Sequence, residues 1–180
     1  MWLTIPNLFT FVRILMTPVI LVELARKEFY LAGWLFGGAA LTDLLDGAVP
    51  RRFGAESRIG LYLDPIADKI LLSGIYIGLA AARAVPLWIV LVIFARDLWI
   101  LLLSAIALRF TKFRNLQPSN WGKASTFLQI MTAVAIMGAN AFHDNVLAQI
   151  CKALIWGVAT LAAISGTDYA FRGVAWLRQR

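Results

Sequence analysis

The sequence predicts an all-α integral membrane protein, a bundle of six transmembrane helices that forms one domain over residues 1–180. Hydrophobic residues make up 61% of the chain and charged residues only 15%, whereas an average soluble domain is about 45–50% apolar. Apolar runs near the ~20 residues needed to cross a bilayer recur along the whole length. A soluble fold of this size could not hide so much apolar surface, so lipid is its natural solvent.

Six apolar runs are separated by short polar connections that contain helix breakers. We expect the first span to be retained rather than cleaved as a signal peptide, because Arg13 interrupts it and no small-residue cleavage site follows. The charged triplet 26–28 precedes the second span, and Pro50 closes it. Gly60 begins the third, Pro86 opens the fourth, and polar triplets precede the last two. The expected spans are 6–25, 29–48, 60–82, 86–108, 124–142 and 146–171.

Basic residues are distributed unequally between the two sides of the predicted bundle, ten on the side of the termini and four on the other. Because positive loops stay inside, we expect both termini and the candidate active site to be cytoplasmic, at the inner membrane of a bacterium. The net charge of +7 then reflects orientation and attraction to anionic lipid headgroups, not nucleic-acid binding. The ten are Arg51, Arg52, Arg58, Arg109, Lys112, Arg114, Lys123, Arg172, Arg178 and Arg180, and the four are Arg26, Lys27, Arg83 and Lys152.

Four aspartates of the second and third spans lie within one stretch of 26 residues: Asp43 and Asp46, then Asp64 and Asp68. Spacings of three and four place each pair on one face of its helix. A carboxylate at membrane depth costs roughly 2.5–3.5 kcal/mol, so a cationic partner is required. Divalent cations remove the mutual repulsion, and carboxylate oxygens suit Mg²⁺, Mn²⁺ or Ca²⁺ better than zinc. The four aspartates are therefore predicted metal ligands.

Two glycines accompany the aspartates, Gly47 directly after Asp46 and Gly60 before the third span. Without side chains they would let a bulky ligand approach the backbone, although a glycine at either place alone is more typical of a helix end or a loop. Two further glycine pairs, each spaced by four residues, are predicted to allow close helix packing rather than chemistry. These pairs are Gly33/Gly37 and Gly74/Gly78.

In order and spacing, these residues resemble the signature of the CDP-alcohol phosphotransferases, Asp-x2-Asp-Gly-x2-Ala-Arg-x8-Gly-x3-Asp-x3-Asp. The chain departs from it at Pro50, where the family has alanine, and this affects the expected position of Arg51. The six-span layout and the opening Ile5-Pro6-Asn7-Leu8 with Arg13 are also similar, so the likeness covers nearly the whole chain. The matching residues are Asp43, Asp46, Gly47, Arg51, Gly60, Asp64 and Asp68.

The resemblance implies an enzyme of phospholipid biosynthesis that transfers the phosphatidyl group of CDP-diacylglycerol to an alcohol and releases CMP. It also implies that Asp43, Asp46 and Asp64 hold two divalent cations, Mg²⁺ or Mn²⁺, together with the diphosphate. Asp68 would complete the metal site and serve as the general base that takes the proton of the acceptor.

The same resemblance implies where the nucleotide binds. Gly47 and Gly60 would admit the cytidine nucleotide, and Arg51 would contact its phosphates. Members of the family act as homodimers in the membrane, so a homodimer in contact with membrane lipids is expected here.

The acceptor alcohol depends on residues farther along the chain. Two interpretations of Arg96 and Asp97 stay open: the two charges neutralise each other, or Arg96 and Lys123, helped by Arg114, bind a phosphate on the acceptor. Arg13 is either a snorkelling residue or a further member of that set. Segment 118–129 resembles phosphatidylglycerophosphate synthases, whereas the Arg-Asp dipeptide resembles cardiolipin synthases. We expect sn-glycerol 3-phosphate as acceptor, with phosphatidylglycerol as the alternative.

A cation channel or transporter is the alternative from another class of protein. It would spread its acidic residues through the membrane thickness or show inverted repeats, whereas these aspartates gather at one face. Cys151 is the single cysteine, so no intramolecular disulfide can form.

Overall fold

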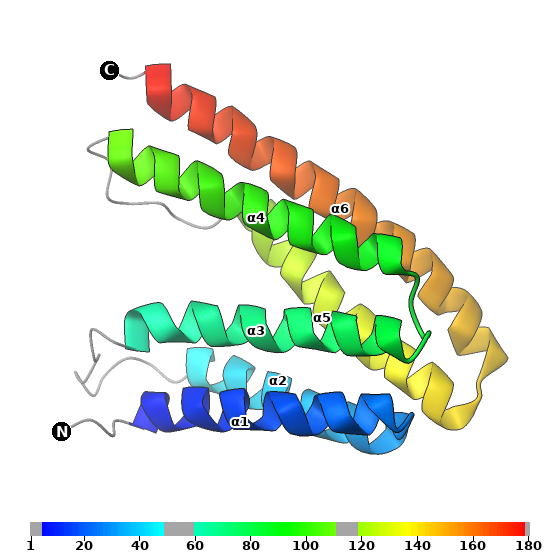
Figure 1. Cartoon of the computed structure of the whole chain (residues 1–180). Coiled ribbons are helices and arrows are strands. Elements are labelled where there is room, and N and C mark those ends of the chain that lie inside the picture. The colour runs from blue at the N-terminus through cyan, green and yellow to red at the C-terminus, as the bar shows by residue number, and fades with distance from the viewer. Residues whose placement is uncertain (1–4, 49–59, 111–118, 179–180) are drawn as a thin grey trace. The chain divides into compact units, whose positions relative to one another are not determined.

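The computed structural model describes residues 5–48, 60–110 and 119–178, with side chains over 13–41, 68–103 and 119–171. These residues form six α-helices and no strand, which confirms the predicted all-α class (Figure 1). The helices are α1 (Ile5–Ala25), α2 (Phe29–Ala48), α3 (Gly60–Ala81), α4 (Leu87–Phe110), α5 (Asn120–Phe142) and α6 (Asn145–Arg178).

The helix boundaries follow the predicted spans closely except at two places. Helix α5 begins at Asn120 rather than at 124, because Ser119 caps it: the Ser119 Oγ accepts a hydrogen bond from the Trp121 amide at 3.2 Å. Helix α6 continues to Arg178 rather than ending at 171. The sequence after 171 turns polar but contains no proline, so the helix extends beyond the apolar run that marked its predicted end.

Three of the connections are tight turns with a residue in the left-handed region, namely Lys27, Arg83 and His143 with φ of 63°, 61° and 53°. This position usually favours glycine, because a Cβ is strained there. After each of these residues, a backbone amide reaches back to a carbonyl in the last turn of the preceding helix, which ends the helix and reverses the chain. The bonds are Glu28 N to Glu23 O (2.9 Å), Ala84 N to Leu79 O (2.8 Å) and Asp144 N to Ala139 O (3.1 Å).

Large apolar side chains are exposed on the described part of every helix. Examples are Trp34 (69% exposed), Trp156 (67%) and Phe171 (74%). Two helical segments, Asn120–Phe142 and Asn145–Phe171, are long and apolar enough to cross a membrane. Exposed apolar surface of this extent is typical of helices that face lipid.

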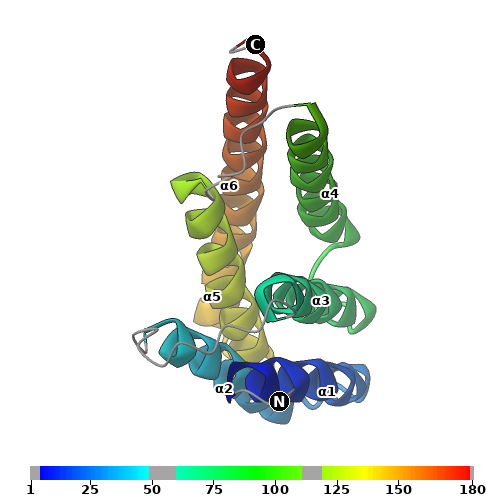
Figure 2. The same ribbon diagram turned by 90° about the vertical axis from the view of Figure 1, so that its left-hand side faces the viewer.

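The chain divides into two compact units. Unit 1 comprises Met1–Val85 and Ala133–Ala148, and unit 2 comprises Pro86–Thr132 and Gln149–Arg180. In unit 1, α1 packs against both α2 and α3, which lie against different sides of it (Figure 2). Helices α1 and α3 run in the same direction (Figure 1). Buried side chains of unit 1 include Ile20, Leu24, Phe36, Ile75, Tyr76 and Leu79.

Two glycines of α3 allow its close approach to α1. A Cβ added at Gly78 would lie 2.7 Å from the Leu24 Cδ1 and 3.0 Å from the Leu21 Cδ2, distances that real Cβ contacts avoid. A Cβ at Gly74 would lie 3.3 Å from the Thr17 Cγ2. The predicted role of the Gly74/Gly78 pair in close helix packing is therefore confirmed.

The other glycine pair behaves differently at its two positions. A Cβ added at Gly33 would lie 3.5 Å from the Met137 Cβ, an ordinary contact. A Cβ at Gly37 would meet no described atom within 4 Å. Among the described residues Gly37 therefore has no close neighbour, and its role in helix packing stays a prediction.

Candidate active site

The predicted metal ligands come from two helices of unit 1. Asp43 and Asp46 lie in the last two turns of α2, and Asp64 and Asp68 lie in the first three turns of α3. The C-terminal end of α2, the N-terminal end of α3 and the N-terminal end of α1 are at the same end of this unit (Figure 1). The backbone thus brings the four aspartates to one end of unit 1. The structure describes the side chain of Asp68 and the backbone of the other three.

The donor set fits a hard divalent cation. Segment 43–68 contains four aspartates and neither histidine nor cysteine, and carboxylate oxygens are the ligands that Mg²⁺ and Mn²⁺ prefer. Within the described side chains, no group of three or more His, Cys, Asp or Glu could hold a metal. Asp43, Asp46 and Asp64 lie outside those side chains, so the metal site stays a prediction.

The carboxylate of Asp68 is bound by a buried arginine of α1. The Arg13 Nη1 donates a hydrogen bond to the Asp68 Oδ1 and forms an ion pair with it. The Arg13 side chain is 6% exposed and that of Asp68 is 44% exposed. A buried guanidinium is tolerated where a carboxylate compensates its charge. The contact to Asp68 was not among the two roles that the sequence suggested for Arg13, a snorkelling residue or a phosphate ligand.

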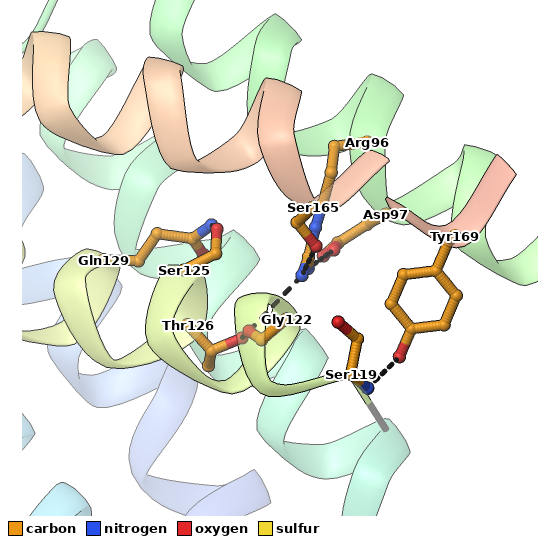
Figure 3. A network of polar contacts seen from close by, with 9 residues as sticks. All are labelled: Arg96, Asp97, Ser119, Gly122, Ser125, Thr126, Gln129, Ser165 and Tyr169. Carbon is orange, nitrogen blue, oxygen red and sulfur yellow. Dashed lines mark hydrogen bonds and ion pairs between the residues drawn. The ribbon is translucent and has the colours of Figure 1, made fainter. Parts of the chain in front are cut away.

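A second polar cluster lies in unit 2, where Arg96 of α4 reaches α5 and α6 (Figure 3). The Arg96 Nη1 donates to the Asp97 Oδ1 at 2.6 Å. The Nη2 donates to the Ser165 Oγ at 2.9 Å and to the Gly122 carbonyl at 3.4 Å. The Arg96 side chain is 8% exposed, and its Nε has no hydrogen-bond partner among the described residues. The pair of opposite charges is therefore present, yet one buried N–H of the guanidinium has no acceptor in the part of the chain that the structure describes.

Two hydrogen bonds of Ser119 join the start of α5 to α6, close to Arg96. The Ser119 amide donates to the Tyr169 hydroxyl at 3.1 Å, and the Ser119 Oγ donates to the Asp168 Oδ2. Gly122 lies close to both Arg96 and Tyr169: a Cβ there would be 3.4 Å from both the Arg96 Nη2 and the Tyr169 Cε2. Any larger residue at 122 would press on both side chains.

The remaining predicted site residues are spread over both units. Lys123 is exposed in the first turn of α5, and its amide donates to the Ser119 carbonyl at 3.0 Å. Gly47 lies in the last turn of α2, and Gly60 is the first residue of α3. Three other positions, Pro50, Arg51 and Arg114, lie outside the described residues.

Sequence reasoning did not single out the residues of α5 and α6 that surround Arg96. Asp168 is a carboxylate inside the predicted span 146–171, so the rule that marked the other aspartates applies to it equally. Ser119 follows Pro118 just before a helix, which is typical of an N-cap. The contacts of Ser165 and Tyr169 left no signal in the sequence, because serine and tyrosine occur often in helices without such a role.

The family model of the CDP-alcohol phosphatidyltransferases matches residues 3–165. The chain belongs to the CDP-alcohol phosphatidyltransferase family. It is a phosphatidyltransferase, an enzyme of phospholipid biosynthesis. The family uses CDP-diacylglycerol and an alcohol acceptor and is generally dependent on divalent cations.

Relatives of two kinds match along most of the chain. A “Probable phosphatidylglycerophosphate synthase” of Mycobacterium tuberculosis is 32% identical over 184 residues, which cover 96% of this chain and 84% of that protein. A “CDP-diacylglycerol--glycerol-3-phosphate 3-phosphatidyltransferase” of Rickettsia felis is 31% identical and covers 92% of both chains. A “Cardiolipin synthase (CMP-forming)” of Streptomyces coelicolor is 33% identical, over 93% of this chain and 74% of its own.

Proposed function

We propose that this phosphatidyltransferase uses sn-glycerol 3-phosphate as its acceptor and produces phosphatidylglycerophosphate with release of CMP. The buried guanidinium of Arg96, whose Nε has no acceptor among the described residues, carries the proposal of an anionic acceptor. A buried N–H left without an acceptor costs free energy, and a phosphate oxygen supplies an acceptor of the right charge. Two of the relatives described above are named for this acceptor or its product.

The acceptor phosphate is proposed to bind Arg96, Lys123 and Arg114. Arg96 supplies the buried charge, and Lys123 supplies an exposed one from the first turn of α5. Guanidinium groups match the oxygens of a phosphate in geometry and charge. Arg114 precedes this turn in the sequence, and its basic charge is the ground for including it.

Phosphatidyl transfer is proposed to take place at the four aspartates of unit 1. Asp43, Asp46 and Asp64 would hold two divalent cations, Mg²⁺ or Mn²⁺, and Asp68 would complete the set. Cations bound there would offset the negative charge of the attacking and leaving oxygens. Asp68 would take the proton of the acceptor hydroxyl, and Arg13 would orient its carboxylate through the contact of Nη1 with Oδ1.

The nucleotide is proposed to lie beside the aspartates. Gly47 and Gly60 at the ends of α2 and α3 would give it access to the backbone, and Arg51 would contact its phosphates. We treat residues 1–180 as one domain, because the family match over 3–165 includes parts of both units.

The placement in the membrane is part of the same proposal. The exposed apolar side chains on every helix support six spans, and the excess of basic residues on one side supports cytoplasmic termini and active site. We place the enzyme in the inner membrane of a bacterium, as a homodimer.

A cardiolipin synthase that uses phosphatidylglycerol as acceptor is the second candidate. Its support is the Arg96–Asp97 pair, joined by a 2.6 Å hydrogen bond, since the Arg-Asp dipeptide resembles cardiolipin synthases. The headgroup phosphate of phosphatidylglycerol would satisfy Arg96 as well as glycerol 3-phosphate does.

A parallel acceptor assay distinguishes the two candidates. Purified protein receives CDP-diacylglycerol, Mg²⁺ or Mn²⁺, and either sn-glycerol 3-phosphate or phosphatidylglycerol, and released CMP and the lipid product are measured. We expect CMP and phosphatidylglycerophosphate with the first acceptor only. Cardiolipin formed from the second acceptor alone would establish the alternative, and CMP release with neither would contradict both.

A further inference from the structure

Every polar group of Ser119, the residue before α5, takes part in a hydrogen bond. Its amide donates to the Tyr169 hydroxyl at 3.1 Å, and its Oγ donates to Asp168. The same Oγ accepts from the Trp121 amide at 3.2 Å, and its carbonyl accepts from the Lys123 amide at 3.0 Å. Ser119 is 1% exposed. A buried residue with all its donors and acceptors engaged has a single favourable position.

The first turn of α5 that Ser119 fixes also contacts Arg96. The Gly122 carbonyl accepts from the Arg96 Nη2 at 3.4 Å, and the missing side chain of Gly122 leaves room for the side chains of Arg96 and Tyr169 (Figure 3). Ser165 of α6 binds the same Nη2 at 2.9 Å. The positions of Arg96 and Lys123 therefore depend on the same helical turn. Arg96 binds its Gly122 carbonyl, and Lys123 is itself part of the turn.

We propose that Ser119, Asp168 and Tyr169, which we call the α5 latch, are positioning residues for the acceptor phosphate. The latch holds the first turn of α5 against α6, so that Lys123 and Arg96 face the acceptor in one fixed geometry. The inference rests on the proposed role of Arg96 and Lys123 in acceptor binding. It assigns a role to two α6 residues, Asp168 and Tyr169, and to the N-cap of α5.

The latch is separate from the residues proposed for the other substrate. CDP-diacylglycerol is assigned to the aspartates, Gly47, Gly60 and Arg51, all between residues 43 and 68, whereas the latch is made by α5 and α6. A loosened latch should therefore weaken acceptor binding and leave CDP-diacylglycerol binding unchanged. A general loss of folding would affect both substrates alike, so the two explanations are distinguishable.

Steady-state kinetics of full-length variants in lipid nanodiscs test the latch. Tyr169→Phe removes one hydroxyl and keeps the ring, and Ser119→Ala removes both bonds of the Oγ. Thr167→Ala is the matched control on the same helix, because among the described residues the Thr167 Oγ1 bonds only to carbonyls of α6 itself, Ala163 at 3.1 Å and Ile164 at 2.9 Å. The KM of each substrate, kcat and the melting temperature are measured for every variant.

Tyr169→Phe is expected to raise the acceptor KM about three- to tenfold, the effect of one lost hydrogen bond. Ser119→Ala is expected to raise the acceptor KM further. In both variants the KM of CDP-diacylglycerol should change less than about twofold, which is less than the effect of one lost hydrogen bond. Thr167→Ala should match the wild type. Equal changes in the two KM values, or an unchanged acceptor KM in Tyr169→Phe and Ser119→Ala, would overturn the latch.

The proposed acceptor and the latch can fail separately in this experiment. Each variant is assayed with sn-glycerol 3-phosphate and with phosphatidylglycerol, and the latch is scored on the acceptor that the wild type uses. Wild-type synthesis of cardiolipin would overturn the proposed acceptor and still test the latch, because that acceptor also carries a phosphate. A wild type that uses only an acceptor without phosphate would overturn the latch as well.

Discussion

Replacing Gly78 of α3 by alanine tests how closely α1 and α3 must approach for Arg13 to reach Asp68. These helices run in the same direction (Figure 1). Along them, Arg13 contacts Asp68, and Leu24 packs against Gly78. Alanine at 78 places a Cβ at 2.7 Å from the Leu24 Cδ1, which is too short for two carbon atoms. Leu24 is 0% exposed, so either its side chain takes another rotamer inside a packed interior or α3 moves away from α1, and both cost free energy.

The size of the effect follows by comparison with Gly37→Ala in α2. Both substitutions gain about 1 kcal/mol of helix propensity. A Cβ at 37 meets no described atom within 4 Å, so that variant keeps the gain and should be more stable than the wild type. A Cβ at 78 also overpacks the helix contact, which typically costs 1–3 kcal/mol. We therefore expect Gly78→Ala to be about 1–3 kcal/mol less stable than Gly37→Ala.

Tryptophan fluorescence during heating in detergent micelles reports this difference, and CMP release reports its effect on the site. We expect Gly37→Ala to melt above the wild type with unchanged turnover. Gly78→Ala should melt several degrees lower than Gly37→Ala and release CMP more slowly, because α3 and with it Asp68 move away from Arg13. Equal melting temperatures for the two alanine variants would refute the close packing of α1 on α3.

Three further predictions concern single residues. Arg13→Gln should slow CMP release about tenfold or more, with partial recovery in Arg13→Lys, since losing a charged hydrogen bond costs about 1.5–3 kcal/mol; wild-type turnover in Arg13→Gln would contradict the positioning role. Asp68→Asn should nearly abolish CMP release and also lower the melting temperature, because it leaves the buried Arg13 without its carboxylate. The matched control is Asp144→Asn at the start of α6, where the Asp144 Oδ1 accepts from the Val146 and Leu147 amides at 2.8 and 3.1 Å, and this variant should stay active. Lys27→Gly should raise the melting temperature slightly, because glycine relieves the φ of 63°; a clear decrease would mean that the Lys27 side chain stabilises the turn.

The helices could be predicted from the sequence because a membrane span needs a fixed apolar length. The second span was expected at 29–48, and α2 has those bounds. The prediction failed where polar residues belong to a helix. Ser119 and the residues after it look like a loop by composition, yet they form the cap and first turn of α5.

The candidate site was predictable only in part. The aspartates and Arg96 stand out because charged groups are rare in apolar segments. The partners of these charged residues could not be predicted from the sequence. The contact of Arg13 with Asp68 joins residues 55 positions apart, and that of Arg96 with Ser165 joins residues 69 apart. Such contacts depend on how helices pack, and a periodic pattern along one helix carries no information about them.

The number of Mn²⁺ ions bound per chain is the most direct test of the proposal that the aspartates form a metal site. Purified protein with CDP-diacylglycerol is equilibrated with Mn²⁺, and bound ions are counted by electron paramagnetic resonance for the wild type, Asp43→Asn and Asp64→Asn. We expect two ions per chain in the wild type and fewer in either variant. Absence of saturable Mn²⁺ binding, or binding that both variants retain in full, would contradict a metal site at these aspartates.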